Sequence, residues 1–304
     1  MNKRNFVKLE HRGFTLIELL ISMAIAGIVT AAIYAAFQAQ QRSSVIQENV
    51  NQMQQNLRAA MEIVIKDVRM AGYGRPNVGG VGILDVRPRG NAKVNPLPDY
   101  DNGFTGNGAI QLSADFNDNG VLNPEETITY SIFDSPVGAP DQKPDLAREV
   151  GGGARQLLAE NIESLGFAFA FDADGDGNID TYDATGMVPL PADPEQRRRI
   201  IWAVCTTTNV NLLNRNLDTN LDGVIDENDD ADNNDLIEGV ALASPVDPAD
   251  IRAVRIWMLA RTDRPDDRFR NPETYVVGHK VLTPGDNYRR RLLETIVRCR
   301  NLEF

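Results

Sequence analysis

The sequence predicts an α+β protein in which one long N-terminal helix packs on an antiparallel β-sheet domain. Two observations lead to this prediction. Helical periodicity runs without a proline through residues 14–75, and after Pro76 it gives way to short alternating runs broken by Gly, Pro, Asn and Asp. The 304 residues suffice for a sizeable core beyond the helix. Because the amphipathic half of the helix needs an apolar face to cover it, we expect the sheet to lie there.

The first part of the helix is an apolar run, residues 14–37, in which Glu18 is the only formal charge. Its length of about 36 Å at helical rise exceeds the ~30 Å hydrocarbon thickness of a bilayer. Basic residues precede the run and no further one follows until Arg42, which favours a cytoplasmic N-terminus and an outer globular part. A secretory signal would be cut after its apolar region, whereas here the small residue Gly13 precedes it. We therefore expect a retained, single membrane-spanning helix.

Glu18 predicts a function for this helix. A carboxylate inside a membrane-length apolar segment costs about 2.5–3.5 kcal/mol unless it finds a partner. If the chain is cut after Gly13, Phe14 acquires a free α-amino group. Glu18 of one subunit can then pair with this amine on its neighbour as the helices pack side by side.

The helix continues as an amphipathic segment, residues 38–75. Its apolar positions recur in steps of three and four: Val45, Ile46, Val50, Met53, Leu57, Ala60, Met61, Val64 and Val68. Gly72 and Gly74, followed by Pro76, predict its end. The chain thus divides into a leader (1–13), a membrane-spanning or filament-core helix (14–37), its amphipathic continuation (38–75) and a β-rich head (76–304).

Residues 12–20, Arg-Gly-Phe-Thr-Leu-Ile-Glu-Leu-Leu, resemble the processing and methylation signature of type IV prepilins and related pseudopilins. The resemblance implies that a prepilin peptidase cuts after Gly13 and methylates Phe14, and that Glu18 is needed for assembly. Four further stretches resemble the PilW group of minor pilins: residues 67–74, 158–165, 251–261 and 290–301. The length of the chain also favours a large minor pilin over a shorter major one.

The resemblance implies a minor pilin that waits as a single-pass inner-membrane protein and then enters, or primes, a type IV pilus at the cell surface. Its partners would be other pilin subunits and the prepilin peptidase. Three alternatives stay open: a pseudopilin of type II secretion in a periplasmic pseudopilus, a calcium-dependent adhesin at the pilus tip, and, more remotely, a secreted calcium-dependent hydrolase.

The head is predicted to contain seven strands. They are residues 109–113, 127–133, 164–171, 199–206, 251–260, 274–281 and 292–298. The alternation of Phe and Ala in residues 167–171 predicts a core strand with its aromatic side chains on one face.

Three acidic loops share one spacing of oxygen-bearing side chains, with glycine at position 6 and an aliphatic residue at position 8. They are residues 115–126, 172–183 and 218–229. Calcium takes six to eight oxygen ligands, and a glycine-assisted turn can bring them round one point. Without a cation the clustered carboxylates would repel one another. One such stretch alone is typical of a solvated turn, but three in the same register predict up to three calcium sites.

The predicted ligands include the carbonyl oxygens at position 7. They are Asp115, Asn117, Asn119, Val121 and Glu126; Asp172, Asp174, Asp176, Asn178, Asp180 and Asp183; and Asp218, Asn220, Asp222, Val224, Asp226 and Asp229. The loops resemble EF-hand and dockerin-type calcium loops. The sequence predicts strands or turns beside them in place of the two helices of an EF-hand, so only the ligand spacing is transferred. The neighbouring acids Asp230, Asp232 and Asp235 have no assigned role.

Composition argues against two other classes of function. The net charge of −12 disfavours a nucleic-acid partner, because such affinity comes mainly from Lys and Arg. After leader removal His279 would be the last histidine, and no nucleophile, base and acid group can be assembled around it, so we expect no enzyme. Cys205 and Cys299 predict either one disulfide in an oxidising compartment or two buried thiols.

Overall fold

The computed structural model describes residues 14–74, 81–86, 109–134, 143–183, 186–207 and 210–302. The leader, with the predicted cleavage residue Gly13, lies outside the described residues. The chain separates into two compact units, Met1–Glu48 and Asn49–Phe304. The division falls inside the predicted amphipathic segment, so the part of that segment after Glu48 belongs to the head unit.

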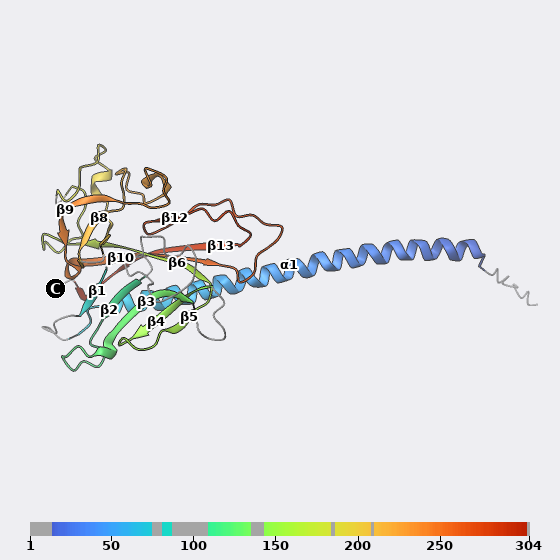
Figure 1. Cartoon of the computed structure of the whole chain (residues 1–304), viewed down its shortest axis with the longest axis horizontal. Helices are drawn as coiled ribbons and strands as arrows, with labels where there is room; N and C mark the ends of the chain where they lie inside the picture. The colour runs from blue at the N-terminus through green and yellow to red at the C-terminus, as the bar shows by residue number, and fades with distance from the viewer. Residues whose placement is uncertain are drawn as a thin grey trace, which may run out of the picture. The chain divides into compact units, whose positions relative to one another are not determined.

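One helix, α1 (Leu16–Met70), occupies the span predicted to be helical (Figure 1). It ends close to the predicted point, because Gly72 takes a left-handed φ of 78° that other residues rarely adopt. The Gly72 N–H donates to the Ser113 carbonyl at 3.0 Å, which joins the helix end to a strand. Asn301 Nδ2 donates to the carbonyl of Arg69 at 3.1 Å, so the C-terminal segment satisfies one of the last helical carbonyls.

Within the head unit, α1 buries one apolar stripe. Its members are Met53, Leu57, Ala60, Met61, Val64 and Val68. These are the later positions of the predicted stripe, whereas Val45, an earlier one, is exposed. Full burial of an aliphatic side chain of this size contributes roughly 1.5–3 kcal/mol. The second half of α1 is therefore an integral part of the head.

Polar side chains also join α1 to a sheet. The Tyr130 hydroxyl and Arg148 Nε both donate to Asp67 Oδ2, the second over 3.1 Å. Burial and the Asp67 carboxylate raise the pKa of Tyr130. The neutral phenol therefore remains the donor at physiological pH.

The head contains two large antiparallel sheets and one small one (Figure 1). The five-stranded sheet has the order β1 (Gly82–Asp85), β2 (Ala109–Ser113), β3 (Thr127–Asp134), β4 (Pro144–Val150) and β5 (Gln156–Ala159). The six-stranded sheet has the order β13 (Arg290–Arg298), β10 (Ile251–Arg261), β6 (Ile162–Phe171), β7 (Ala203–Val204), β8 (Leu213–Asn216) and β9 (Val240–Val246). A hairpin forms the third, β11 (Tyr275–Val277) and β12 (Lys280–Leu282).

The six-stranded sheet separates two apolar cores. The central strand β6 is buried along its whole length because it contributes to both. Its aromatic residues join the α1 stripe in the first core: Phe167, Phe169 and Phe171. The second core holds Ala168, Ala170, Trp202, Val204, Leu217, Ile225, Ile237, Ala253, Trp257, Leu259, Tyr275, Val277 and Val281. The predicted one-sided aromatic alternation is thus confirmed.

The structure differs from the predicted strands in three ways. The head has two large sheets, with β1, β4, β5, β8 and β9 as strands that were not predicted. The predicted strand 199–206 shortens to β7, because residues before it bond to a loop: Ile201 N donates to Asp180 O at 3.2 Å. The predicted strand 274–281 folds into the hairpin β11–β12, with Gly278 at a left-handed φ of 66° between the strands.

Cys205 and Cys299 are both buried thiols with no bond between them, so the predicted disulfide is wrong and the alternative holds. Cys205 follows β7 and Cys299 follows β13, and two strands, β10 and β6, separate these in the sheet. Three strand spacings place them at least about 14 Å apart. A disulfide needs Cα atoms within about 7 Å.

Gly166 of β6 sets how closely the β11–β12 hairpin approaches the sheet. A Cβ at Gly166 would lie 2.5 Å from Gly278 N and 2.7 Å from the Val277 carbonyl carbon. Gly166→Ala should therefore displace the hairpin and lower the free energy of unfolding by about 1–3 kcal/mol. Thermal unfolding of the full chain in detergent measures this. Gly27→Ala is the control, because a Cβ there meets nothing within 4 Å, and equal melting of both variants would refute the role of Gly166.

Candidate functional site

Glu18 sits at the N-terminal end of α1, where it bonds to Thr15. Thr15 N and Thr15 Oγ1 both donate to Glu18 Oε2 at 2.9 Å, and Glu18 N donates to Thr15 Oγ1 at 3.3 Å. This reciprocal arrangement is a capping box, which satisfies backbone donors that have no partner inside the helix. Thr15 was not among the predicted functional residues, although the Thr-x-x-Glu spacing is a sequence signal for a capping box.

The capping box leaves part of the Glu18 carboxylate available. Both bonds from Thr15 go to Oε2, whereas a carboxylate offers about four acceptor positions on its two oxygens. A cation can therefore approach Oε1 without displacing Thr15. The preceding residue, Phe14, is 87% exposed.

The apolar part of α1 is exposed in the isolated chain. Its large exposed side chains are Phe14, Leu16, Ile17, Leu19, Leu20, Ile21, Met23, Ile25, Ile28, Val29, Ile33, Tyr34 and Phe37. Within the described residues, α1 is the one helix long and apolar enough to cross a membrane. Such a surface requires lipid or other apolar helices around it.

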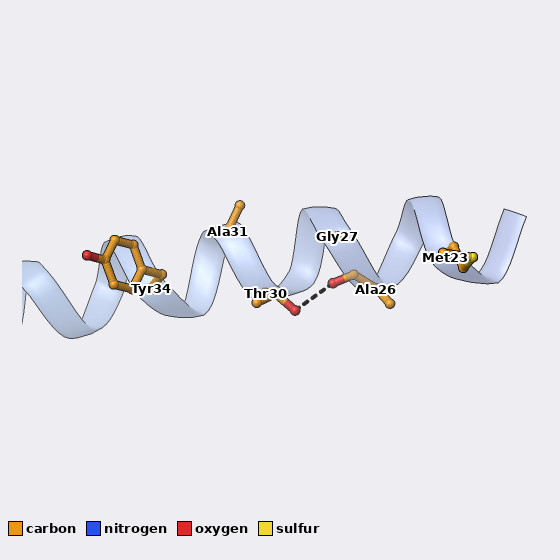
Figure 2. Close-up of a pocket in the computed structure, with 6 residues that line it drawn as sticks. All are labelled: Met23, Ala26, Gly27, Thr30, Ala31 and Tyr34. Atoms are coloured by element: carbon orange, nitrogen blue, oxygen red, sulfur yellow. Dashed lines mark hydrogen bonds between the residues drawn. The ribbon is translucent and has the colours of Figure 1, made fainter. Parts of the chain in front are cut away.

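Small residues interrupt this surface on one face of α1, as Figure 2 shows. A shallow groove there is lined by Met23, Ala26, Gly27, Thr30, Ala31 and Tyr34. Thr30 Oγ1 donates to the Ala26 carbonyl at 2.8 Å, so the hydroxyl is satisfied within its own helix (Figure 2). Small residues allow the backbones of two apolar helices to approach closely. This face can therefore receive a neighbouring helix.

The three acidic loops share one backbone path, which supports the predicted register. Position 4 has positive φ in each: Asp118 (54°), Gly175 (73°) and Leu221 (61°). Position 6 does too, at Gly120 (82°), Gly177 (84°) and Gly223 (79°). Two left-handed residues separated by one tighten the loop around the first aspartate.

In every loop the first aspartate accepts at least two backbone N–H bonds. Asp115 accepts from Asn119 and Gly120, Asp172 from Asp176 and Gly177, and Asp218 from Asp222 and Gly223, over 2.7–3.1 Å. These bonds hold the carboxylates at position 1 on the inner side of each turn.

A buried carboxylate closes each loop, but not always at the predicted position. Glu126 accepts from Asn117 N at 3.2 Å and Asp229 from Thr219 N at 2.6 Å, both from position 12. In the second loop Asp180, at position 9, accepts from Ala173 N at 2.9 Å. Asp183, the predicted twelfth residue, is exposed.

The second loop has a geometry that fits a cation. Carboxylate oxygens of Asp172, Asp174 and Asp176 lie within 4.8 Å of one another. Two oxygens bound at about 2.4 Å to one calcium ion are at most about 4.8 Å apart. Burial, followed by the repulsion of these acids, raises the pKa of Asp180. Arg252 Nε lies 3.7 Å from Asp172 Oδ2 and offsets part of the negative charge.

The second and third loops are joined to each other. The hydroxyl of buried Tyr182, from the second loop, donates to Asp218 Oδ2 at 2.7 Å. Asn216 Nδ2 donates to the Tyr182 hydroxyl at 3.0 Å and to the Asp218 carbonyl at 2.9 Å. Burial is the largest influence on Asp218 and Asp229, and it raises the pKa of both. The third loop also supplies Ile225, its eighth residue, to the second core.

A fourth loop, residues 230–238, follows the same path and was not predicted. Asp230 accepts from Asn234 N at 3.1 Å and Asp235 N at 2.9 Å, as the first aspartates of the other loops do. The sixth position is Asp235 at φ 68°, where the other loops have glycine, and this substitution hid the repeat. Its eighth residue, Ile237, is buried in the second core.

Comparison with protein families matches both ends of the chain. The prokaryotic N-terminal methylation motif matches residues 10–34, which include Gly13, Phe14 and Glu18. The family described as type IV pilus-assembly protein W matches residues 217–301, from the third acidic loop to the end of β13. These matches support a type IV pilus minor pilin of the PilW family.

Among solved structures, the chain is similar to a type IV-like pilin from Thermus thermophilus. The two are 10% identical with a TM-score of 0.31, over 82% of this chain and 95% of the other. A comparison with curated proteins found no match. The two family matches point to a structural pilin, and the apolar helix with its methylation motif indicates a membrane-anchored, pilus-associated protein.

Proposed function

We propose that this PilW-type pilin is cut between Gly13 and Phe14 by a prepilin peptidase and then enters a type IV pilus through α1. The single observation that supports this most is Glu18, a lone carboxylate in an exposed apolar helix within the methylation motif. Before the cut the chain waits in the inner membrane, and afterwards its head is displayed on the cell surface.

The cut supplies the partner that Glu18 needs. While the leader is attached, the nitrogen of Phe14 is a neutral amide. Cleavage converts it into a cation, and a charge-assisted hydrogen bond to Glu18 Oε1 of an adjacent subunit can form beside the Thr15 bonds. Such bonds to charged groups contribute about 1.5–3 kcal/mol. Burial of the surrounding apolar helices supplies the rest of the contact.

Mass spectrometry of the mature N-terminus tests the processing step. We expect a chain that starts at Phe14 and carries one methyl group on its amine. The control is Gly13→Val, which should retain the leader and remain in the membrane fraction. An unprocessed leader on protein recovered from the cell surface would refute the proposal.

We also propose that the three acidic loops bind calcium and stabilise the head. The ligands are the residues predicted above, except that Asp180 replaces Asp183 in closing the second loop. A cation would offset the repulsion among the clustered carboxylates and stabilise the folded state, to which alone it binds in this geometry. Because Ile225 of the third loop is buried in the second core and Ile179 of the second loop packs against that core, calcium would hold these side chains in place.

A further inference from the structure

The strand β13 lies at one edge of the six-stranded sheet and pairs along its full length with β10. Cys299 N donates to Arg252 O and Thr262 N to Arg289 O, so the odd-numbered residues of β13 direct their backbone groups toward β10. The N–H and C=O groups of Leu292, Glu294 and Ile296 therefore point outward. Among the described strands, none pairs with this side.

The middle of this edge is apolar and effectively neutral. Ile296 is 52% exposed, and Leu292 and Leu293 are half-buried. The charge of Glu294 is offset by Arg255, whose Nε lies 2.6 Å from Glu294 Oε1. Natural edge strands are usually guarded by a charge or a proline near their centre, and β13 has neither in an uncompensated form.

The ends of the edge are basic. Arg291, Arg298 and Arg300 are exposed, and residues 289–300 hold five arginines and one glutamate in a chain of net charge −12. Full-length antiparallel pairing with a second β13 would place Arg298 opposite Arg290, whose guanidinium is already held by Glu163 and Asp286. The one carboxylate of the strand, Glu294, is already paired with Arg255, so a second copy offers no free acid to the exposed arginines. The edge therefore favours a different, acidic partner.

We propose that the outward edge of β13 binds an extended segment of another pilus subunit by strand addition. The segment would carry an apolar residue opposite Ile296 and acidic residues opposite Arg298 and Arg291. Main-chain hydrogen bonds supply affinity in this mode, and the alternate side chains supply specificity. The partner class rests on the proposed pilin function, whereas the surface follows from the register of β13.

Two variants at one position test the edge in the full-length protein, expressed in cells that assemble pili. Ile296→Pro removes the outward N–H without breaking a β10–β13 bond. We expect the amount of this protein in sheared pili to fall at least about tenfold, which corresponds to the loss of one contact of modest strength. Ile296→Thr keeps the N–H and strand propensity and should be incorporated nearly as wild type. Melting of both variants in detergent should match wild type, which separates loss of docking from loss of folding.

A photo-crosslinking side chain at position 296 identifies the occupant. We expect a product with another pilin subunit, joined within an extended segment that has acidic residues, and none when the same group replaces the exposed Val210. Arg298→Glu should weaken this product. Normal incorporation of Ile296→Pro, or a product formed only between two copies of this chain, would overturn the proposed edge. Absence of the wild-type protein from pili would instead refute the pilin function on which the partner rests.

Discussion

Glu18→Ala should remove this protein from assembled pili while leaving its membrane insertion intact. The substitution deletes the acceptor for the Phe14 amine of the adjacent subunit, so a charge-assisted hydrogen bond of about 1.5–3 kcal/mol is lost per contact. We expect incorporation to fall by about 10- to 100-fold. Quantitative immunoblots of sheared pili and of the inner membrane measure the two populations.

Two matched variants separate the charge of Glu18 from its capping role. Glu18→Gln can still accept from Thr15 in a capping box, because glutamine serves at this position, but it offers no negative charge. Thr15→Ala removes most of the box, at about 0.5–2 kcal/mol of helix stability, and keeps the charge. If pairing between subunits decides assembly, Glu18→Gln behaves like Glu18→Ala and Thr15→Ala is incorporated. The opposite pattern would show that the helix cap is what matters.

The helix could be predicted from sequence because its signals are local. The apolar run, the stripe that contains Leu57 and Val64, and the stop at Gly72 each depend on residues within a few turns of one another. The buried central strands β6 and β10 were also predicted, because strands with a core on both faces contain long apolar runs, here residues 165–171 and 256–260.

Strands defined by distant partners could not be predicted in the same way. In β4, Asp145 and Arg148 weaken the apolar pattern, and Arg148 donates to Asp67, 81 residues earlier. In β9, Ser244 and Pro245 suggest a turn, yet the strand pairs with β8. The segment before β7 was wrongly extended as a strand, because its partner is an acidic loop.

In the acidic loops, too, only the residues that depend on local spacing could be predicted from the sequence. Spacing alone located the first aspartates correctly, since the turn places them by local hydrogen bonds. It assigned Asp183 because twelve-residue loops usually close at their last position, whereas here the buried Asp180 makes that bond. The fourth loop escaped notice because Asp235 adopts a backbone conformation that sequence reading assigns to glycine.

Calcium removal should loosen the second core more than the first. Trp202 and Trp257 both lie in the second core, to which the third loop supplies the buried Ile225. Chelation of the full-length protein in detergent should therefore shift tryptophan emission to longer wavelength and lower the melting temperature. A site that is occupied at a hundredfold excess over its dissociation constant contributes about 2.7 kcal/mol. Magnesium at equal concentration is the control, because its smaller octahedral shell fits these loops poorly.

Asp218→Asn tests the calcium site further, because its effect on the melting temperature should change direction when calcium is added. A purely structural aspartate would not show this change. Asparagine can place its one oxygen where Asp218 Oδ2 lies, to accept from Gly223 N and the Tyr182 hydroxyl, but it loses the acceptor for Asp222 N and weakens cation binding. In the wild type without calcium, the buried Asp218 charge destabilises the fold, as its raised pKa indicates. Removal of that charge should outweigh the lost Asp222 bond, so the neutral variant should melt at the same or a higher temperature. With calcium the order should reverse. Because Tyr182 donates to Asp218, Tyr182→Phe should weaken calcium binding in the third loop while leaving Asp172, Asp174 and Asp176 in place. Melting curves that do not cross between the two conditions would show that the loops stabilise the head without a metal.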